Sequence, residues 1–527
     1  MRDPSAFDDP DVLHLETKRK TGIQWLLFSR TGQVAILLFI ELLFIIVAYV
    51  WLEESLGYIV IVENILAIAV IIYIFNSDIN GSAKLTWTFL VMLFTIPATV
   101  LLFYSNMDFG FRKLKDRSTY MVEKSRGMIP QPDGVLDDPD LKNDNLVNLN
   151  AYINRSGTFP LFKNTEVTYF PVGEEKFEAM LTELEKAESF IFLEYFIVEE
   201  GYMWGRILKI LAEKARQGVD VRFMYDGFCD ISKLPHDYPK RVRELGIKCR
   251  KFTPVRPFIT TSYNYRDHRK ILVIDGRVAF NGGVNLADEY INRTEPYGDH
   301  WKDCAVMLRG DAVRSFTLMF LQMWNMHEDV PSWDEAKVEP GPCAGNGYVM
   351  PYCDTPMDDY KVGRDVYADI LYRADRYVHI MTPYLILDSE LDTALRFAAQ
   401  RGVDVKLMLP GVPDKKGAYS LAKTHYRTLI DAGVKIYEYT PGFLHSKVFV
   451  SDDKTAVVGT INLDYRSLYH HFECATYMYR TDCIPDIERD FQEALTRCRE
   501  VTHETIRNEK LSFKIVGTIL KVIAPMM

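Results

Sequence analysis

The chain has 527 residues, more than one hydrophobic core usually serves, so two or more domains are expected. Its formal net charge of −10 argues against general coating of nucleic acid, which requires a strongly basic surface, and we expect no nucleic-acid partner. The eight cysteines are scattered, with no CxxC pair and no His-Cys ligand spacing. This pattern predicts free thiols in a reducing compartment and argues against a disulfide framework or a zinc site.

Three apolar runs lie in an N-terminal block at residues 32–105, namely 34–52, 59–75 and 85–104. Each is close to the roughly 20 residues that a helix needs to cross a bilayer core, so we predict transmembrane helices. Aromatic residues near the ends of the runs are typical of membrane interfaces. The preceding residues, 1–31, are expected to form a cytoplasmic or interfacial segment.

Basic residues flank this block on both sides, at Lys18–Lys20 and within Arg112–Arg117. The positive-inside rule would place both clusters in the cytoplasm, which three full crossings cannot do. Either one run is re-entrant or interfacial, or one cluster is exported. The cysteine pattern favours a cytoplasmic soluble region in a multi-pass protein of the cell membrane.

The remainder of the chain divides by composition into several parts. A polar, irregular stretch at 106–160 is expected to be a linker, and α/β sequence then follows in two blocks around a hinge rich in proline and glycine. The C-terminal tail mixes lysine with apolar residues, and is expected either to lie as an amphipathic helix on anionic lipid or to pack on the soluble region. The predicted boundaries are 161–330 for the first domain, 331–347 for the hinge, 348–500 for the second domain and 501–527 for the tail.

The two blocks repeat the same order of predicted elements. In the first block, a buried strand at 190–198 precedes a helix at 203–217 and a strand at 219–225. The corresponding elements of the second block are predicted at 377–386, 390–401 and 403–409. This alternation predicts an α/β fold of two tandem domains, each a sheet covered by helices, that form a pseudo-two-fold pair.

A spaced motif occurs once in each block. One register aligns five positions of the two copies, which indicates an internal duplication. The matched pairs are His268 and His445, Lys270 and Lys447, Asp275 and Asp452, Gly282 and Gly459, and Asn285 and Asn462.

Each copy is predicted to lie on a β-hairpin. His268 and Lys270 are two residues apart on a predicted strand, as are their counterparts, so each pair projects from one face. Asp275 and Asp452 fall at the hairpin turns, and we predict a structural role for these two carboxylates although they complete the motif.

This combination of side chains suits a phosphodiester. A neutral imidazole can attack phosphorus while a second, protonated imidazole donates to the leaving oxygen, so His268 and His445 are the candidate catalytic pair. Lysine and asparagine can hold the nonbridging oxygens, and no metal or cofactor is required. The phosphate-binding candidates are Lys270, Lys447, Asn285 and Asn462.

Each histidine also needs a partner for its other ring nitrogen. Asp303, 35 residues after His268, and Glu473, 28 residues after His445, are the candidate orienting carboxylates, with pairing across the pseudo-two-fold one arrangement. We predict only a secondary role in the site for the additional histidines His300, His470 and His471.

The paired motifs resemble those of the phospholipase D superfamily over roughly residues 161–500. Flanking features resemble bacterial cardiolipin synthases, as does a membrane hairpin before the catalytic part. The resemblance implies phosphatidyl transfer between two phosphatidylglycerol molecules in the membrane, giving cardiolipin and glycerol, with His268 as phosphohistidine and His445 as general acid/base. The flanking features are the segments beginning at Tyr225, Asn264, Gly282, Thr382, Pro441 and Asn462.

Two departures accompany the resemblance. The family often carries asparagine where this chain has His471, and commonly shows two spans where this chain adds the run at 34–52. A hydrolytic phospholipase D and a phosphatidyltransferase using another alcohol are alternatives, with a nuclease or a non-catalytic scaffold less favoured. A homo-oligomer is compatible with the sequence.

Overall fold

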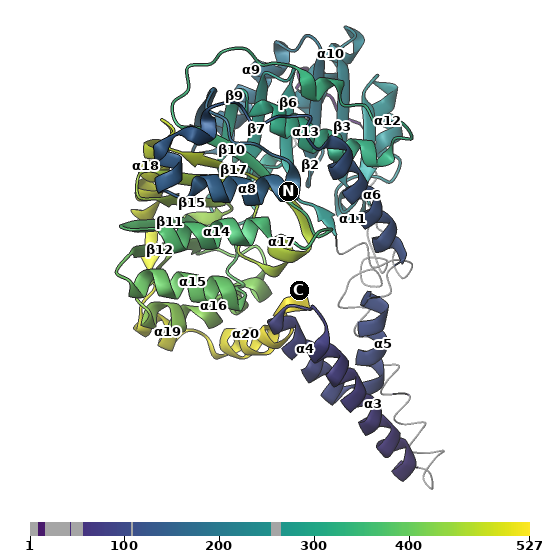
Figure 1. The fold of residues 1–527 in the computed structure, drawn as a ribbon, viewed down its shortest axis with the longest axis vertical. Coiled ribbons are helices and arrows are strands. Elements are labelled where there is room, and N and C mark those ends of the chain that lie inside the picture. The colour runs from purple at the N-terminus through teal and green to yellow at the C-terminus, as the bar shows by residue number, and fades with distance from the viewer. Residues whose placement is uncertain (1–8, 16–42, 44–55, 107–108, 254–264, 527) are drawn as a thin grey trace.

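Two mixed β-sheets with the same strand order form the centre of the molecule (Figure 1). The computed structural model describes residues 9–15, 43, 56–106, 109–253 and 265–526. The first sheet has the order β1-β9-β7-β6-β2-β3-β4, with β2, β3 and β4 parallel and the other neighbours antiparallel. Its strands are β1 (Thr165–Phe170), β2 (Phe190–Tyr195), β3 (Asp220–Asp226), β4 (Lys248–Phe252), β6 (Lys270–Ile274), β7 (Val278–Gly282) and β9 (Ala305–Gly310).

The second sheet repeats this order as β10-β17-β16-β15-β11-β12-β13, and then adds β18 at its edge. Its parallel strands are again three consecutive neighbours toward one side of the sheet, β11, β12 and β13. The matching topology supports the predicted pair of tandem α/β domains. The strands are β10 (Tyr348–Asp354), β11 (Tyr377–Met381), β12 (Asp404–Pro410), β13 (Lys435–Tyr439), β15 (Val448–Ser451), β16 (Thr455–Gly459), β17 (His471–Tyr479) and β18 (Cys498–Glu500).

Helices cover both faces of each sheet. Every residue of β2 is buried, as a strand covered on both faces requires. One face of the first sheet packs on α9, α10 and α12, and the other packs on α13 and the second half. The helices of the two halves are α9 (Gly173–Glu185), α10 (Tyr202–Arg216), α11 (Cys229–Ser232), α12 (Tyr238–Glu244), α13 (Val313–Trp324), α14 (Val362–Arg373), α15 (Ser389–Gln400), α16 (Lys416–Asp431), α17 (Tyr465–Tyr469) and α18 (Ile484–Leu495).

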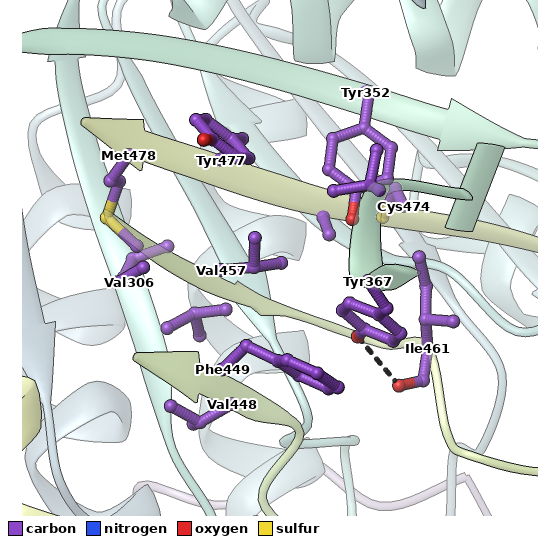
Figure 2. Close-up of a cluster of buried hydrophobic side chains, with 14 of the residues drawn as sticks. Val306, Tyr352, Tyr367, Val448, Phe449, Val457, Ile461, Cys474, Tyr477 and Met478 are labelled. Atoms are coloured by element: carbon purple, nitrogen blue, oxygen red, sulfur yellow. Dashed lines mark hydrogen bonds between the residues drawn. The ribbon is translucent and has the colours of Figure 1, made fainter. Parts of the chain in front are cut away.

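One hydrophobic cluster continues from one half into the other. Val306 of β9 belongs to the same buried cluster as Met478 of β17 (Figure 2). In the second half, the Tyr367 ring stacks on Phe449 with 3.9 Å between centroids, and its hydroxyl donates to the Ile461 carbonyl at 3.0 Å (Figure 2). Because the shared core removes apolar surface of both halves from water, it holds the two sheets together.

The N-terminal apolar runs differ from the prediction. The run at 59–75 lies in α3 (Leu56–Asn76), but the run at 85–104 is divided between α4 (Gly81–Leu93) and α5 (Thr95–Asn106). Proline at 97 lacks an amide hydrogen and its ring clashes with the carbonyl four residues earlier, which explains a break at this point.

Among the described helices, none is both long and apolar enough to span a bilayer, so the predicted N-terminal transmembrane helices are not supported. The run at 34–52 falls outside the described residues apart from residue 43.

The expected linker at 106–160 is largely helical. It forms α6 (Phe109–Ser125), α7 (Pro139–Asn143) and α8 (Leu146–Gly157). Leu146, Leu149 and Ile153 repeat at helical spacing, and all three are buried in the shared core. The prediction of an irregular linker is therefore wrong, because the abundant Asn and Asp of this stretch obscured an apolar helix face.

The predicted hinge at 331–347 contains one short 3-10 turn at Asp334–Lys337. In the tail, α19 (His503–Asn508) precedes α20 (Leu511–Ile523), which packs along α16. A Cβ at Gly517 would lie 2.2 Å from the Ser420 carbonyl oxygen, so glycine permits this close approach. The opposite side of α20 exposes apolar side chains, and the tail thus combines features of both expected arrangements.

Residues 9–15 lie against α10 of the first half. The Leu13 amide donates to the Gly205 carbonyl at 3.1 Å, and Lys209 pairs with Asp11 at 2.7 Å. A Cβ at Gly205 would lie 2.3 Å from the Val12 side chain, so glycine again allows the contact. Residues 9–15 are therefore docked on the first domain.

Candidate active site

Two short strands carry the motif histidines from one half toward the other. β5 (Arg266–Asp267) pairs with the start of β17, and the His268 amide then donates to the Phe472 carbonyl at 2.9 Å. β14 (Gly442–Leu444) pairs with β8 (His300–Lys302), and the His445 amide donates to the Lys302 carbonyl at 2.7 Å. Each histidine thus precedes β6 or β15 instead of lying within the strand as predicted, because its backbone pairs with the opposite half.

Each imidazole bonds a carboxylate of the opposite half. His268 Nδ1 lies 2.9 and 3.0 Å from the two oxygens of Glu473, and His445 Nδ1 lies 2.6 Å from Asp303 Oδ2. Both carboxylates are fully buried. The structure therefore shows the predicted orienting carboxylates in the crosswise arrangement. Since Nδ1 is engaged in both rings, Nε2 is the nitrogen left for chemistry.

Thr460 supports the carboxylate on the His268 side. Its hydroxyl donates to Glu473 Oε2 and lies 3.1 Å from the Cys474 carbonyl, while its amide also donates to that carbonyl. Thr460 is not among the site residues predicted from the sequence. Its position directly after Gly459 in the second motif is the signal that could have found it.

The two motif lysines are buried beside their histidines. Lys270 Nζ donates to the His268 carbonyl at 2.6 Å, and Lys447 Nζ donates to the His445 carbonyl. Burial lowers the pKa of Lys270 to about 8 and that of Lys447 to about 7, although buried Asp303 and Glu473 oppose the shift. Because burial disfavours both ammonium groups, a bound anion would stabilise their charged forms.

The side chains of the two motif asparagines differ in the hydrogen bonds they form. Asn285 Oδ1 accepts from the Ile197 amide at 3.0 Å, and its Nδ2 donates to the Tyr290 hydroxyl at 2.8 Å. Asn462 Oδ1 is buried without a partner among the described residues. The two residues are matched in sequence, yet Asn285 holds protein groups at both side-chain atoms while the Asn462 side-chain oxygen holds none among the described residues.

The motif aspartates lie away from the imidazoles, at the turns after β6 and β15. Asp275 accepts from the amides of residues 188, 189 and 190 at 2.7–2.8 Å. Asp452 accepts from the amides of residues 375, 376 and 377 at 2.8–2.9 Å. Each has a positive φ, 52° and 56°, which aspartate tolerates better than most residues. Their predicted structural role agrees with these contacts.

Both catalytic candidates are neutral imidazoles in the substrate-free protein. Burial and Lys270 hold the pKa of His268 well below its usual range. Burial and Lys447 lower the pKa of His445 to about 4, although Asp303 opposes this shift. A neutral imidazole is the nucleophilic form, so the lowered pKa of His268 suits it for attack.

Aromatic rings enclose both imidazoles. Phe196 and His471 lie beside His268, with ring centroids 4.9 and 5.4 Å away. The set around His445 is formed by Tyr290, Trp301 and Phe443, at 5.5, 5.5 and 5.8 Å. These rings exclude water, which strengthens electrostatic interactions inside the site. Of these rings, His471 was predicted to have only a secondary role, and Trp301 is not among the residues predicted from the sequence.

His268, His471 and Glu473 could hold a metal ion, since their ligand atoms lie within 4.8 Å of one another. Glu473 already accepts from His268 and Thr460. A metal bound to a ring nitrogen of His268 would occupy an atom needed for attack or orientation. The donor set therefore fits an inhibitory ion better than a catalytic one.

Two α/β halves that each complete the histidine site of the other define a phospholipase D-like protein. Residues 180–324 and 367–495 match the family described as cardiolipin synthase, PLD-like domain. The chain belongs to this family of PLD-like cardiolipin synthases.

Individual relatives agree with this assignment. A Geobacillus cardiolipin synthase is 33% identical over 462 residues, covering 85% of this chain and 90% of the relative. One from Alkalihalophilus pseudofirmus is 30% identical over 487 residues, covering 90% and 95%. The crystal structure of Haemophilus influenzae phosphatidylserine synthase covers 73% of this chain and 97% of its own, with a TM-score of 0.55 and 14% identity. That last likeness concerns the fold alone.

Proposed function

We propose that this protein is a cardiolipin synthase that transfers a phosphatidyl group from one phosphatidylglycerol to another. The observation that carries the proposal is the crosswise pair of buried imidazoles, each held at Nδ1 by a carboxylate of the opposite half. Membership of the cardiolipin synthase family supports the choice of substrate.

The first step breaks the bond between phosphorus and the glycerol headgroup. His268 Nε2 attacks phosphorus and forms an N–P bond, while protonated His445 gives its proton to the departing glycerol oxygen. Lys270, Lys447 and the Asn462 amide stabilise charge on the nonbridging oxygens.

The second step regenerates the enzyme. The terminal hydroxyl of a second phosphatidylglycerol gives its proton to His445, and its oxygen attacks phosphorus as the N–P bond to His268 breaks. As the bond to His268 breaks, both imidazoles return to the state they had in the first substrate complex, with His268 neutral and His445 protonated, and cardiolipin leaves. Atoms and charge balance with no cofactor.

Incubation of the purified full-length protein with phosphatidylglycerol alone tests the proposal. We expect cardiolipin and glycerol in equal amounts. Release of phosphatidic acid without cardiolipin would instead identify a hydrolytic phospholipase D, because water and the alcohol compete for the same intermediate. Adding ethanolamine or serine tests for a transferase that prefers another alcohol. In that case the product formed with the added alcohol would exceed cardiolipin.

We also propose that the protein is bound to the cell membrane with its catalytic halves in the cytoplasm. Apolar side chains of α3, α4 and α20 are exposed, including Leu85 and Leu511, each 70% exposed. α4 and α20 are neighbours, since Thr86 donates to the Val522 carbonyl at 2.7 Å. Apolar surface of this extent, with Lys514 and Lys521 on α20, suits an anionic bilayer surface.

Two further features support the cytoplasmic side. The docked residues 9–15 must lie on the same side of a membrane as the first domain, which is compatible with both basic clusters that flank the apolar block in the cytoplasm. All eight cysteines are free.

Labelling of the half-buried Cys343 by an impermeant maleimide provides the test, with C343S as control. We expect labelling only after the cells are permeabilised, and labelling of intact cells would contradict this orientation.

A further inference from the structure

His471 and Trp301 occupy matched positions in the two halves. Each lies two residues before the carboxylate that bonds a catalytic histidine, Glu473 or Asp303. Their strands, β17 and β8, pair in parallel with β5 and β14, the short strands that lead into the two histidines. The pseudo-two-fold therefore places His471 beside His268 and Trp301 beside His445.

Both side chains are buried, and within the described part of the chain their ring nitrogens make no close hydrogen bond. The two residues are each 8% exposed, and their rings lie 5.4 Å from His268 and 5.5 Å from His445. Among the described residues, Trp301 Nε1 and both ring nitrogens of His471 form no hydrogen bond. His471 Nδ1 lies 3.6 Å from Glu473 Oε1, beyond hydrogen-bonding distance.

Unpartnered polar atoms are costly in such a buried site. Native proteins almost always satisfy buried donors, and the exceptions call for a ligand, a water or a functional role. The same lack of hydrogen-bond partners occurs at two equivalent positions, each next to a catalytic ring. This repetition points to one ligand that contacts both halves. The reacting phosphate is the group that lies between the two imidazoles.

We propose that His471 and Trp301 are further phosphate-binding residues, whose ring N–H groups donate to the nonbridging oxygens of the phosphodiester. This inference rests on the proposed function for the identity of the natural substrate. After transfer, phosphorus is attached to Nε2 of His268, and its oxygens lie next to the ring of His471. The indole reaches the same group from the side of His445.

Neutral donors suit this position. Lys270 and Lys447 already supply positive charge to a site closed to water, and a third permanent cation would repel them. An indole N–H carries no charge, and burial keeps the His471 imidazole neutral by lowering its pKa to about 3. Both rings can therefore bind an anion without further crowding of charge.

The variants H471F and W301F remove the N–H groups while keeping aromatic rings in place. The probe is dimethyl phosphate, a phosphodiester with one permanent negative charge, titrated calorimetrically into the full-length protein. We expect each variant to bind it about tenfold or more weakly than wild type, since hydrogen bonds to charged groups are among the stronger ones. With phosphatidylglycerol, each should raise KM more than it lowers kcat.

Two further variants complete the design. H471N restores a side-chain N–H and should recover most of the affinity lost in H471F. Y297F is the matched control, because the Tyr297 ring lies 6.1 Å from that of Trp301 but its hydroxyl is not one of the proposed donors, and it should bind as wild type does. Thermal melting of each variant checks that the fold is kept.

Unchanged affinity for dimethyl phosphate in both H471F and W301F would overturn the proposal. So would a fall in kcat with unchanged affinity, because the residues would then act by positioning the catalytic histidines. If wild type forms no cardiolipin but its dimethyl phosphate binding still depends on both rings, the proposed function fails while this inference stands.

Discussion

Asp303 and His445 belong to different halves of the chain, and 2.6 Å separates the carboxylate Oδ2 from the imidazole Nδ1. The reciprocal bond joins Glu473 of the second half to His268 of the first. Neither half contains a complete catalytic histidine with its carboxylate. The shared core that joins the sheets is therefore a condition for chemistry as well as for stability.

The two histidines should differ in whether they trap an intermediate. With a phosphatidyl 4-nitrophenyl ester labelled in its acyl chains, H445A should retain label on the protein, because His268 can still expel a leaving group that needs no proton while the acid/base that promotes release is missing. H268A should retain none. Denaturing gels at neutral or alkaline pH, which preserve phosphohistidine, would show the difference. Label on H268A but not on H445A would reverse the two roles.

Variants of the two orienting carboxylates should respond differently to the leaving group of the substrate. E473Q and D303N are each expected to lower kcat for phosphatidylglycerol by about 10²–10⁴, because an amide cannot hold the imidazole in the same tautomer or stabilise its charge. A 4-nitrophenyl phosphodiester has a leaving group that needs no proton. D303N should therefore recover much of its first-step rate on this substrate, whereas E473Q should not. The burst of nitrophenolate measures that step, and equal recovery in both variants would contradict the assignment.

Binding of a phosphodiester should be accompanied by proton uptake. The pKa of free His445 is lowered to about 4, and a bound anion raises it by stabilising the imidazolium. Between the free and bound pKa values, the complex holds a proton that the free protein lacks, so affinity strengthens as pH falls through this window.

Calorimetry with dimethyl phosphate at pH 5.5, in buffers of different ionisation enthalpy, measures the protons taken up. At this pH Lys270 and Lys447 are already charged in the free protein, because their pKa values are about 8 and 7. H445Q should therefore take up less than wild type. Equal uptake in the two proteins would show that another group receives the proton.

The motif aspartates should affect stability more than chemistry. D275N and D452N each weaken a carboxylate that accepts three backbone amides, and we expect a loss of about 2 kcal/mol in the free energy of unfolding. Asn keeps the positive φ of both turns. D453N is the matched control, since exposed Asp453 also has a positive φ but pairs with exposed Arg376, which is worth about 0–1 kcal/mol. Urea unfolding compares them, and a loss of activity at unchanged stability would point to a catalytic role.

Several differences from expectation have a common physical origin. The motif histidines leave the predicted strands because their amides bond the carbonyls of Phe472 and Lys302, which are far away in sequence. Residues 106–160 are helical because their apolar positions find a core to pack against. Local pattern alone does not contain such partners, since tertiary contacts override weak propensities.

The sequence by itself determined the duplication, the α/β alternation, the paired histidines and lysines, and the candidate carboxylates, because spacing and periodicity are properties of a few neighbouring residues. Only the tertiary structure decided which carboxylate holds which histidine. The bonded partners are 142 and 205 positions apart, and a folded chain alone sets the distance between them. The same holds for His471 and Trp301, whose place beside the imidazoles follows from the pairing of the two halves.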